Sequence, residues 1–312
     1  PMLEGDFVTL EQGTGIVHAA PSHGPDDFNL CLKHGIKASN TINDGGLYSG
    51  DVPFFSGVHI FKADNQVIEK LSEHKSLLGQ SKLKHSFPHS WRSKAPLVYR
   101  ATSQWFISME MKGLREKALK AIDDTDFYPE RGRARIRSMI ETRPDWCISR
   151  QRIWGVPLPL FVSKKTKEPL KDLEVIENIA KIYEKEGSDC WFTDDPQKFL
   201  GKKYKKEDYI KTSDIVEVWF DSGASHSYVL ENRKDLEWPA SMYLEGSDQH
   251  RGWFHSSLLE SCGTRGRAPY NSILTHGFVV DGKGLKMSKS TGNVIAPDDI
   301  LKKYGADILR TW

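Results

Sequence analysis

Hydrophobic positions in residues 1–85 come in short runs separated by glycine. The runs at 7–10 and 15–20 have strand length and predict two strands. Acids in the first turn after Pro25, followed by apolar residues four apart, predict a helix that begins there. Residues 63–71 predict a second helix. This pattern is typical of a small α/β module.

Arginine is concentrated in the next part of the chain. Basic and aromatic residues interleave from residue 86, and a helix is predicted over about 109–122. Residues 131–152 then hold seven arginines against two acids, a local charge of +5. Helical spacing within this stretch predicts that part of it forms one helix face. The seven are Arg131, Arg133, Arg135, Arg137, Arg143, Arg150 and Arg152.

Residues 163–211 contain Lys, Asp and Glu in nearly equal proportion, which predicts a solvated peripheral insertion. Beyond it, residues 216–220, 242–244 and 272–275 predict three strands, with a helical apolar spacing between the last two. A strand, helix and strand of this length form a parallel βαβ unit. Polar clusters follow these strands, so we expect a ligand site at the carboxyl edge of the sheet.

Composition narrows the class of protein. The chain has 312 residues, a length typical of two or three domains, and 38% hydrophobic with 11% aromatic residues argues against disorder. The net charge of +2 conceals the arginine-rich stretch. No apolar run reaches membrane-spanning length, and the first residues lack a signal-peptide pattern. The four cysteines lie far apart, which argues against a zinc knuckle or a disulfide framework.

The loop Lys286-Met287-Ser288-Lys289-Ser290 carries the most specific chemistry. Two lysines on a mobile loop can neutralise the charge that builds on a leaving pyrophosphate. This string resembles the signature loop of the class I aminoacyl-tRNA synthetases. Residues 143–155 resemble a segment shared by isoleucyl and valyl enzymes of that class. Residues 219–223 and 245–254 resemble the isoleucyl enzymes specifically.

The resemblance covers essentially all 312 residues and implies an α/β fold in three parts. Residues 1–85 resemble the C-terminal part of an inserted, β-barrel-like editing domain. Residues 86–212 correspond to a connecting and peripheral region with the arginine-rich stretch. Residues 213–312 correspond to the second half of a Rossmann-like nucleotide fold with the lysine loop.

The resemblance also implies a synthetic site. Two tryptophans match the walls of an isoleucine pocket, and a dry, rigid pocket suits a branched apolar side chain. The loop lysines match the groups that bind the ATP phosphates. Other residues match positions around the aminoacyl-adenylate, its ribose and its adenine. The implied set is Trp219 and Trp253 for the pocket; Lys286 and Lys289 for the phosphates; and Glu245, Gly246, Asp248, Gln249, His276 and Gly277 for the adenylate.

The implied reaction is the ATP-dependent ligation of isoleucine to tRNA(Ile) through isoleucyl-adenylate. ATP would bring Mg²⁺ with it, and the resemblance implies no zinc site in this segment. It further implies a cytoplasmic enzyme that contacts no membrane and is a monomer at full length. Arg150 and Arg152 are the candidates for contact with the tRNA backbone, because arginine pairs well with phosphate.

Residues 13–28 resemble the hydrolytic editing site of the same enzymes. An apolar pocket separates isoleucine from valine by one methylene, which in the isoleucyl enzymes themselves, the standard example of this limit, gives about 150-fold discrimination. A second, hydrolytic sieve is therefore needed. The resemblance implies that Asp27 holds the α-ammonium group of the misacylated tRNA and that His18 lies near the scissile ester.

Two features of the family pattern are missing from residues 1–312: a His-x-Gly-His string and the threonine-rich wall of the editing pocket. Position 1 is not Met, and Trp312 falls inside a predicted helix, so we expect a central piece of a longer enzyme that is inactive alone. Three alternatives remain open at this point. They are a segment of a valyl enzyme, a free-standing hydrolase of misacylated tRNA, and a non-catalytic tRNA-binding paralogue.

Overall fold

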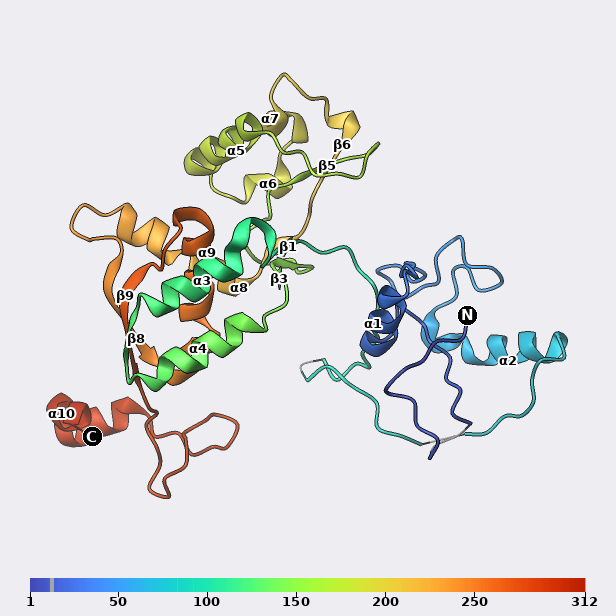
Figure 1. The fold of residues 1–312 in the computed structure, drawn as a ribbon, viewed down its shortest axis with the longest axis horizontal. Helices are drawn as coiled ribbons and strands as arrows, with labels where there is room; N and C mark the ends of the chain where they lie inside the picture. The colour runs from blue at the N-terminus through green and yellow to red at the C-terminus, as the bar shows by residue number, and fades with distance from the viewer. Residues whose placement is uncertain (12–13, 83, 92, 312) are drawn as a thin grey trace. The chain divides into compact units, whose positions relative to one another are not determined.

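The computed structural model describes residues 1–11, 14–82, 84–91 and 93–311 (Figure 1). They form two compact units, Pro1–Ser103 and Gln104–Trp312. The three-part division expected from the resemblance remains a prediction. None of the helices in the described ranges is long and apolar enough to cross a membrane.

Helices and turns dominate the described part of Pro1–Ser103. Helices α1 (Pro25–Lys33) and α2 (Asp64–Glu73) confirm the two helix predictions. The predicted strands at 7–10 and 15–20 are wrong, since their described residues form turns and irregular backbone. Apolar alternation makes a strand only where a second strand accepts its backbone hydrogen bonds, and Gly15 turns the chain with a φ of 72°.

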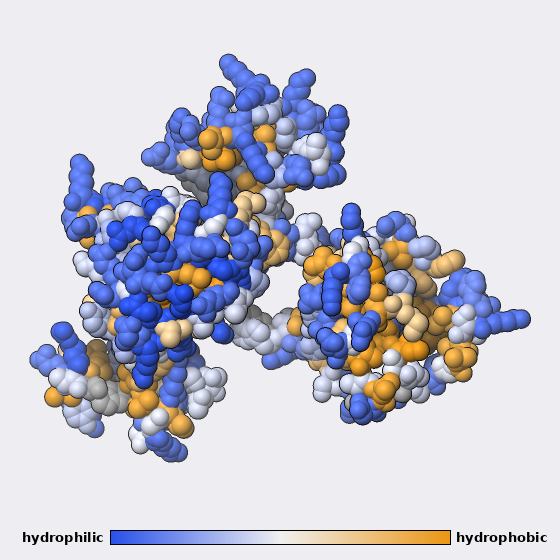
Figure 2. All heavy atoms as spheres, in the orientation of Figure 1, coloured by the Kyte–Doolittle hydropathy of each residue, from blue (hydrophilic) through white to orange (hydrophobic). Residues whose placement is uncertain are grey.

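Few apolar side chains are buried in this first unit. Among its described residues they are Cys31, Ile42 and Ala63. By contrast, Leu10 is 86% exposed and Phe54 is 72% exposed. Figure 2 shows apolar residues spread over the visible surface of this unit. Its folded state therefore rests on little buried area.

A three-stranded parallel sheet organises Gln104–Trp312. Its strands lie in the order β2 (Asp126–Tyr128), β9 (Tyr270–His276) and β8 (Ala240–Gly246). Helix α9 (Trp253–Arg265) connects β8 to its parallel neighbour β9, which confirms the predicted βαβ unit. The α/β fold class with a parallel sheet is confirmed in the same way.

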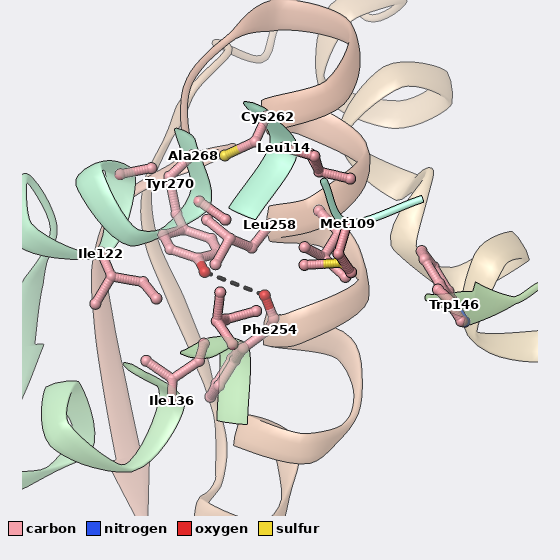
Figure 3. Close-up of a cluster of buried hydrophobic side chains, with 14 of the residues drawn as sticks. Met109, Leu114, Ile122, Ile136, Trp146, Phe254, Leu258, Cys262, Ala268 and Tyr270 are labelled. Carbon is pink, nitrogen blue, oxygen red and sulfur yellow. Dashed lines mark hydrogen bonds between the residues drawn. The ribbon is translucent and has the colours of Figure 1, made fainter. Parts of the chain in front are cut away.

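The main core lies between this sheet and three helices, α3 (Leu114–Asp123), α4 (Arg131–Glu141) and α9. Aromatic and aliphatic side chains fill it (Figure 3), and the Tyr270 hydroxyl donates a 3.1 Å hydrogen bond to the Phe254 carbonyl. Full burial of each large apolar side chain contributes about 1.5–3 kcal/mol. This core fixes the strand ends that carry the candidate site.

The predicted strand at 216–220 is wrong over most of its length. Only β7 (Ile215–Val216) is extended, paired antiparallel with β4 (Ser149–Arg150), and α8 (Val218–Gly223) follows at once. A stretch of only five residues, Val-Glu-Val-Trp-Phe, is too short for its periodicity to separate a strand from a helical turn. The backbone turns at Glu217, whose carboxylate accepts a 3.0 Å hydrogen bond from the Trp146 indole.

The stretch predicted as a solvated insertion has a small core of its own. Trp191 is fully buried there, and its indole donates a 2.8 Å hydrogen bond to the Thr212 carbonyl. Two further short antiparallel pairs and four further helices belong to the described part of this unit. These remaining elements are β1 (Phe106–Ile107) with β3 (Trp146–Cys147), β5 (Phe161–Ser163) with β6 (Tyr209–Lys211), α5 (Leu173–Glu186), α6 (Cys190–Thr193), α7 (Pro196–Leu200) and α10 (Pro297–Thr311).

Candidate functional site

The carboxyl ends of β8 and β9 lie side by side. Glu245 is paired with Thr275 and Gly246 with His276 across the parallel ladder. The structure therefore brings together two groups of candidates that the sequence separates by thirty positions. Gly277 follows directly at the same edge. This edge is where parallel sheets hold their ligands.

Gly246 lies where the backbone is crowded. A Cβ at this position would lie 2.8 Å from the Asp248 carboxylate and 3.2 Å from the Phe278 ring. A larger residue here would displace the Asp248 carboxylate and press on the Phe278 ring. Asp248 and Glu245 are exposed beside it, so both carboxylates are open to a ligand.

The two tryptophans of the candidate pocket converge from different helices. Trp219 projects from α8, and a Cβ at Gly252 would lie 2.8 Å from its ring. Trp253 begins α9 and stacks on Tyr243 with ring centroids 3.9 Å apart. The Trp253 indole donates 3.0 Å to the Ser222 carbonyl, so α8 and α9 fix its orientation together.

Gln249 holds the turn between these groups. Its side-chain oxygen accepts a 3.0 Å hydrogen bond from the Trp253 amide, at the start of α9. Gln249 thus caps the helix that carries one wall of the pocket, which is a positioning contact in this structure. The sequence identified the residue but not this contact.

The carboxyl group of Glu260, on α9, packs against the end of α8. Burial, together with the nearby carboxylates of Asp221 and Glu217, raises the pKa of Glu260 to about 9. Its side chain packs so closely on Gly223 that a Cβ there would collide with it. Glu260 is therefore a neutral packing group at ordinary pH, and no sequence pattern singled it out.

The lysine loop is held at its base by Asn293. The Asn293 side chain accepts 2.9 Å from the Ser288 amide and donates 2.8 Å to the Asp281 carboxylate. That bond, with backbone amides of the turn, lowers the pKa of Asp281. The Lys286 ammonium lies 3.6 Å from the Phe278 ring centroid, a cation–π contact. Lys289 is exposed.

Phe278 and Asn293 are site residues that sequence reasoning missed. Phe278 touches both Gly246 and Lys286, so one ring connects the adenylate candidates to the loop. A signal for Phe278 existed in its position directly after His276 and Gly277. Asn293 was visible only as part of the flank of the lysine string.

The editing candidates lie in the first unit and are not brought into one hollow. His18 is exposed on irregular backbone and lines an apolar hollow of about 560 Å³ with Ile16, Val17 and Leu30. Asp27 is not among the described residues that line it. The Asp27 carboxylate folds back over Gly24 at the start of α1, where an acid stabilises the helix N-terminus.

The two tRNA candidates differ in their contacts. Arg150 donates to the carbonyls of Cys147 (3.0 Å) and Ser149 (2.8 Å) and pairs with Glu217 at 3.4 Å. Its guanidinium is thus largely engaged within the unit. Arg152 is exposed and lines a hollow of about 680 Å³ together with Trp154.

Metal ligands form no cluster in the part of the chain that the structure describes. No group of three or more His, Cys, Asp or Glu side chains there is arranged to hold an ion.

Comparisons with known proteins agree on one family. The family described as "tRNA synthetases class I (I, L, M and V)" matches residues 29–312, a range that excludes His18 and Asp27. A relative from Pelagibacter ubique (strain HTCC1062), named isoleucine–tRNA ligase, is 77% identical over all of this chain and 34% of its own length. One from Syntrophotalea carbinolica, with the same name, is 55% identical over 100% of this chain and 34% of its own length.

Among solved structures, methionyl-tRNA synthetase from Mycobacterium tuberculosis bound by methionyl-adenylate is 19% identical, with a TM-score of 0.44. The match covers 74% of this chain and 36% of that one. The chain spans about a third of the length of the curated relatives it matches.

Proposed function

Because this chain belongs to the class I tRNA synthetases of the isoleucine, leucine, methionine and valine group, we propose that it is the central part of an isoleucine–tRNA ligase. The observation that carries the proposal is the 77% identity over all 312 residues with a relative of that name. A second relative of the same name, 55% identical over the whole chain, supports it.

The proposed chemistry is a two-step ligation at the carboxyl edge of β8 and β9. The carboxylate of isoleucine attacks the α-phosphorus of ATP, and pyrophosphate leaves. A terminal ribose hydroxyl of tRNA(Ile) then attacks the activated carbonyl, and AMP leaves. The protein contributes positioning and charge stabilisation rather than a covalent intermediate.

Each candidate residue has a proposed part in that chemistry. Lys286 and Lys289 neutralise the departing pyrophosphate, and Mg²⁺ enters with ATP. Trp219 and Trp253 enclose the isoleucine side chain. The remaining candidates hold the adenylate, with Asp248 on the ribose and the turn after β9 beside the adenine; they are Glu245, Gly246, Asp248, Gln249, His276 and Gly277.

We propose that His18 and Asp27 belong to a site that hydrolyses valine attached in error to tRNA(Ile). The apolar hollow beside His18 supports this, because a small aliphatic side chain fits such a surface. Arg152, and Arg150 to a smaller extent, would contact the tRNA backbone. The complete enzyme would act as a monomer in the cytoplasm.

The sheet supports the proposal that further residues complete the enzyme. β8 is an edge strand among the described strands, and Met242 and Leu244 on one of its faces are 41% and 53% exposed. Parallel sheets normally bury both faces. The 312-residue chain alone is therefore expected to give no isoleucine-dependent exchange of pyrophosphate into ATP.

The test is that exchange reaction in the complete protein that carries this chain. Lys289→Ala should lower the rate about 100-fold or more, since it removes a charge that acts on the leaving group. Lys283→Ala is the matched control, because Lys283 is an exposed lysine of the same loop. Absence of isoleucine-dependent exchange in the complete protein, or an equal loss in both variants, would overturn the proposal.

A further inference from the structure

Helix α4 carries four arginines in two pairs that face different ways. Residues four apart lie on one face of a helix, so Arg131 pairs with Arg135 and Arg133 with Arg137. The second pair is engaged in the fold. Arg133 donates to the Ile122 carbonyl at 2.7 Å, and Arg137 contacts the Asp123 carboxylate at 2.6 Å.

The first pair has no such partners. Arg131 and Arg135 are both exposed, and neither has an ion pair or side-chain hydrogen bond within the described residues. Together they line a hollow of about 310 Å³. The strand ends also line it, with Ser247 directly after β8, His276 as the last residue of β9 and Gly277 directly after it.

The N-terminal end of α4 adds further positive potential to this hollow. β2 is parallel to β9, so it ends at the same edge of the sheet, and α4 begins three residues after β2. The N-terminal end of α4 therefore lies at the carboxyl edge of the sheet. A helix N-terminus carries about half a positive charge and favours anions.

A buried polar atom in the same hollow lacks a partner. His250 is 2% exposed, and its Nδ1 bonds the Ser247 carbonyl at 2.8 Å. Its Nε2 has no hydrogen-bond partner within the described ranges. That atom points at the first turn of α4, where a Cβ on Gly132 would lie 2.8 Å from it. Buried polar atoms of proteins are normally paired, so an orphan at a hollow suggests a ligand.

The positive charge of Arg135 acts on the buried imidazole of His250. Burial lowers the pKa of His250, and the positive charge of Arg135 lowers it further. An anion beside Arg135 would remove that repulsion. The two guanidinium groups and the helix terminus thus favour an anion. The neutral imidazole donates from Nδ1 to the Ser247 carbonyl, which leaves Nε2 as an acceptor for a hydroxyl of the same ligand.

We propose that Arg131 and Arg135 form a phosphate-binding subsite at the crevice between α4 and the ends of β8 and β9. Guanidinium groups bind phosphate oxygens in pairs, and two of them one helical turn apart can hold one phosphate group. The phosphate belongs either to the ATP substrate or to the backbone of the tRNA acceptor end. The inference rests on the proposed ligase function for the identity of these substrates.

Direct binding to the 312-residue chain tests the subsite without requiring catalysis. The probes are ATP and an RNA minihelix that ends in CCA. The variant is R131Q/R135Q, and the control is K117Q/K120Q, which removes two exposed, unpaired charges from the neighbouring helix α3. The affinity for one probe should fall about tenfold or more in the variant and less than about twofold in the control.

Salt dependence separates a specific contact from general attraction. If RNA is the ligand, R131Q/R135Q should flatten the slope of log affinity against log salt by about 1 to 2, and the control should leave it unchanged. Equal effects of both variants on both probes would overturn the subsite. So would unchanged binding of both probes by R131Q/R135Q.

Kinetics of the complete enzyme identify the source of the phosphate. A tRNA phosphate predicts a raised KM for tRNA in aminoacylation with normal ATP–pyrophosphate exchange. An ATP phosphate predicts a raised KM for ATP in exchange. Normal values of both constants would overturn the subsite. A complete enzyme that lacks exchange even without substitutions would instead reject the proposed function and leave the binding result standing.

Discussion

The two units bury their apolar side chains to very different extents. In Pro1–Ser103 the buried apolar residues of the described chain are Cys31, Ile42 and Ala63. In Gln104–Trp312 the sheet and three helices enclose fully buried aromatic side chains such as Phe254 and Tyr270. Stability follows buried apolar area, so the second unit should hold its site far more rigidly than the first.

This difference matters for the two proposed activities. The adenylate candidates stand on β8, β9 and the start of α9, which the core fixes. His18 stands on irregular, exposed backbone over a thin core. The candidate adenylate residues therefore stand on a rigid base, and the proposed hydrolytic site should depend on whatever further contacts order the first unit.

The largest expected effect comes from removing a phenylalanine ring from each unit, a buried one in the second unit and a half-exposed one in the first. Phe254→Ala should cost about 3–5 kcal/mol of the unfolding free energy of the second unit, because Phe254 is fully buried. Phe61→Ala is the counterpart in the first unit; Phe61 is 51% exposed, and the cost there should be below about 1 kcal/mol. Hydrogen exchange measured by mass spectrometry in urea reports each unit separately. Similar costs in both units would contradict the comparison.

The second test measures how the unfolding free energy of the second unit depends on pH. Burial, with Asp221 and Glu217 nearby, raises the pKa of Glu260 to about 9, whereas the unfolded chain ionises this carboxyl near its ordinary value of 4.5. The folded state keeps a proton that the unfolded state loses. The contribution of Glu260 to the unfolding free energy is therefore fully present below pH 4.5 and is lost as the pH rises toward 9.

The substitution Glu260→Gln should remove this loss of stability with rising pH. Between pH 5.5 and 8 the wild type should lose roughly 1–4 kcal/mol relative to the variant, measured as the difference between their urea unfolding curves. Taking the difference cancels the buried histidines, which titrate in both proteins. Parallel profiles would show that Glu260 is ionised in the folded state.

The third test compares the two arginine pairs of α4. Arg133→Gln should cost about 1–2 kcal/mol, because Arg133 donates to the carbonyls of Ile122 and Asp123 at the end of α3. Arg131→Gln should change the unfolding free energy by less than about 0.5 kcal/mol, as expected for an exposed side chain without partners. A larger cost for Arg131→Gln would mean that its role is structural.

The smallest expected effect comes from shortening a buried side chain in the first unit. Ile42→Val should cost about 1 kcal/mol and act only on the first unit, because Ile42 is one of its few buried side chains. The same hydrogen-exchange measurement should show faster exchange in residues 1–103 and no change in the second unit. Faster exchange in both would show that the two units unfold together.

The sequence predicted elements well where a long periodic pattern met a clear boundary. Helices α1, α2 and α9 and the parallel pair β8–β9 were expected, and with them the edge of the sheet that holds the candidate site. The strand at 216–220 failed because a stretch of five residues is too short to separate a strand from a helical turn by its periodicity. The strands before residue 20 failed because a strand depends on a partner that the local pattern does not reveal.

Side-chain partners were harder to predict than elements. The sequence showed four arginines on α4 but could not tell the pair held by α3 from the pair that faces the strand ends. It offered Arg150 and Arg152 as tRNA contacts, which stay predictions, but it could not show that the Arg150 guanidinium bonds backbone carbonyls and Glu217. Phe278, Asn293 and Glu260 gained their roles only from contacts across the fold.

The most direct measurement is the amino-acid dependence of ATP–pyrophosphate exchange in the complete protein that carries this chain. The account predicts that isoleucine supports exchange with a kcat/KM on the order of 10²-fold above that of valine, the ratio familiar from isoleucyl enzymes, and well above that of leucine. Exchange driven equally or better by valine would contradict it and assign the chain to a different member of the family.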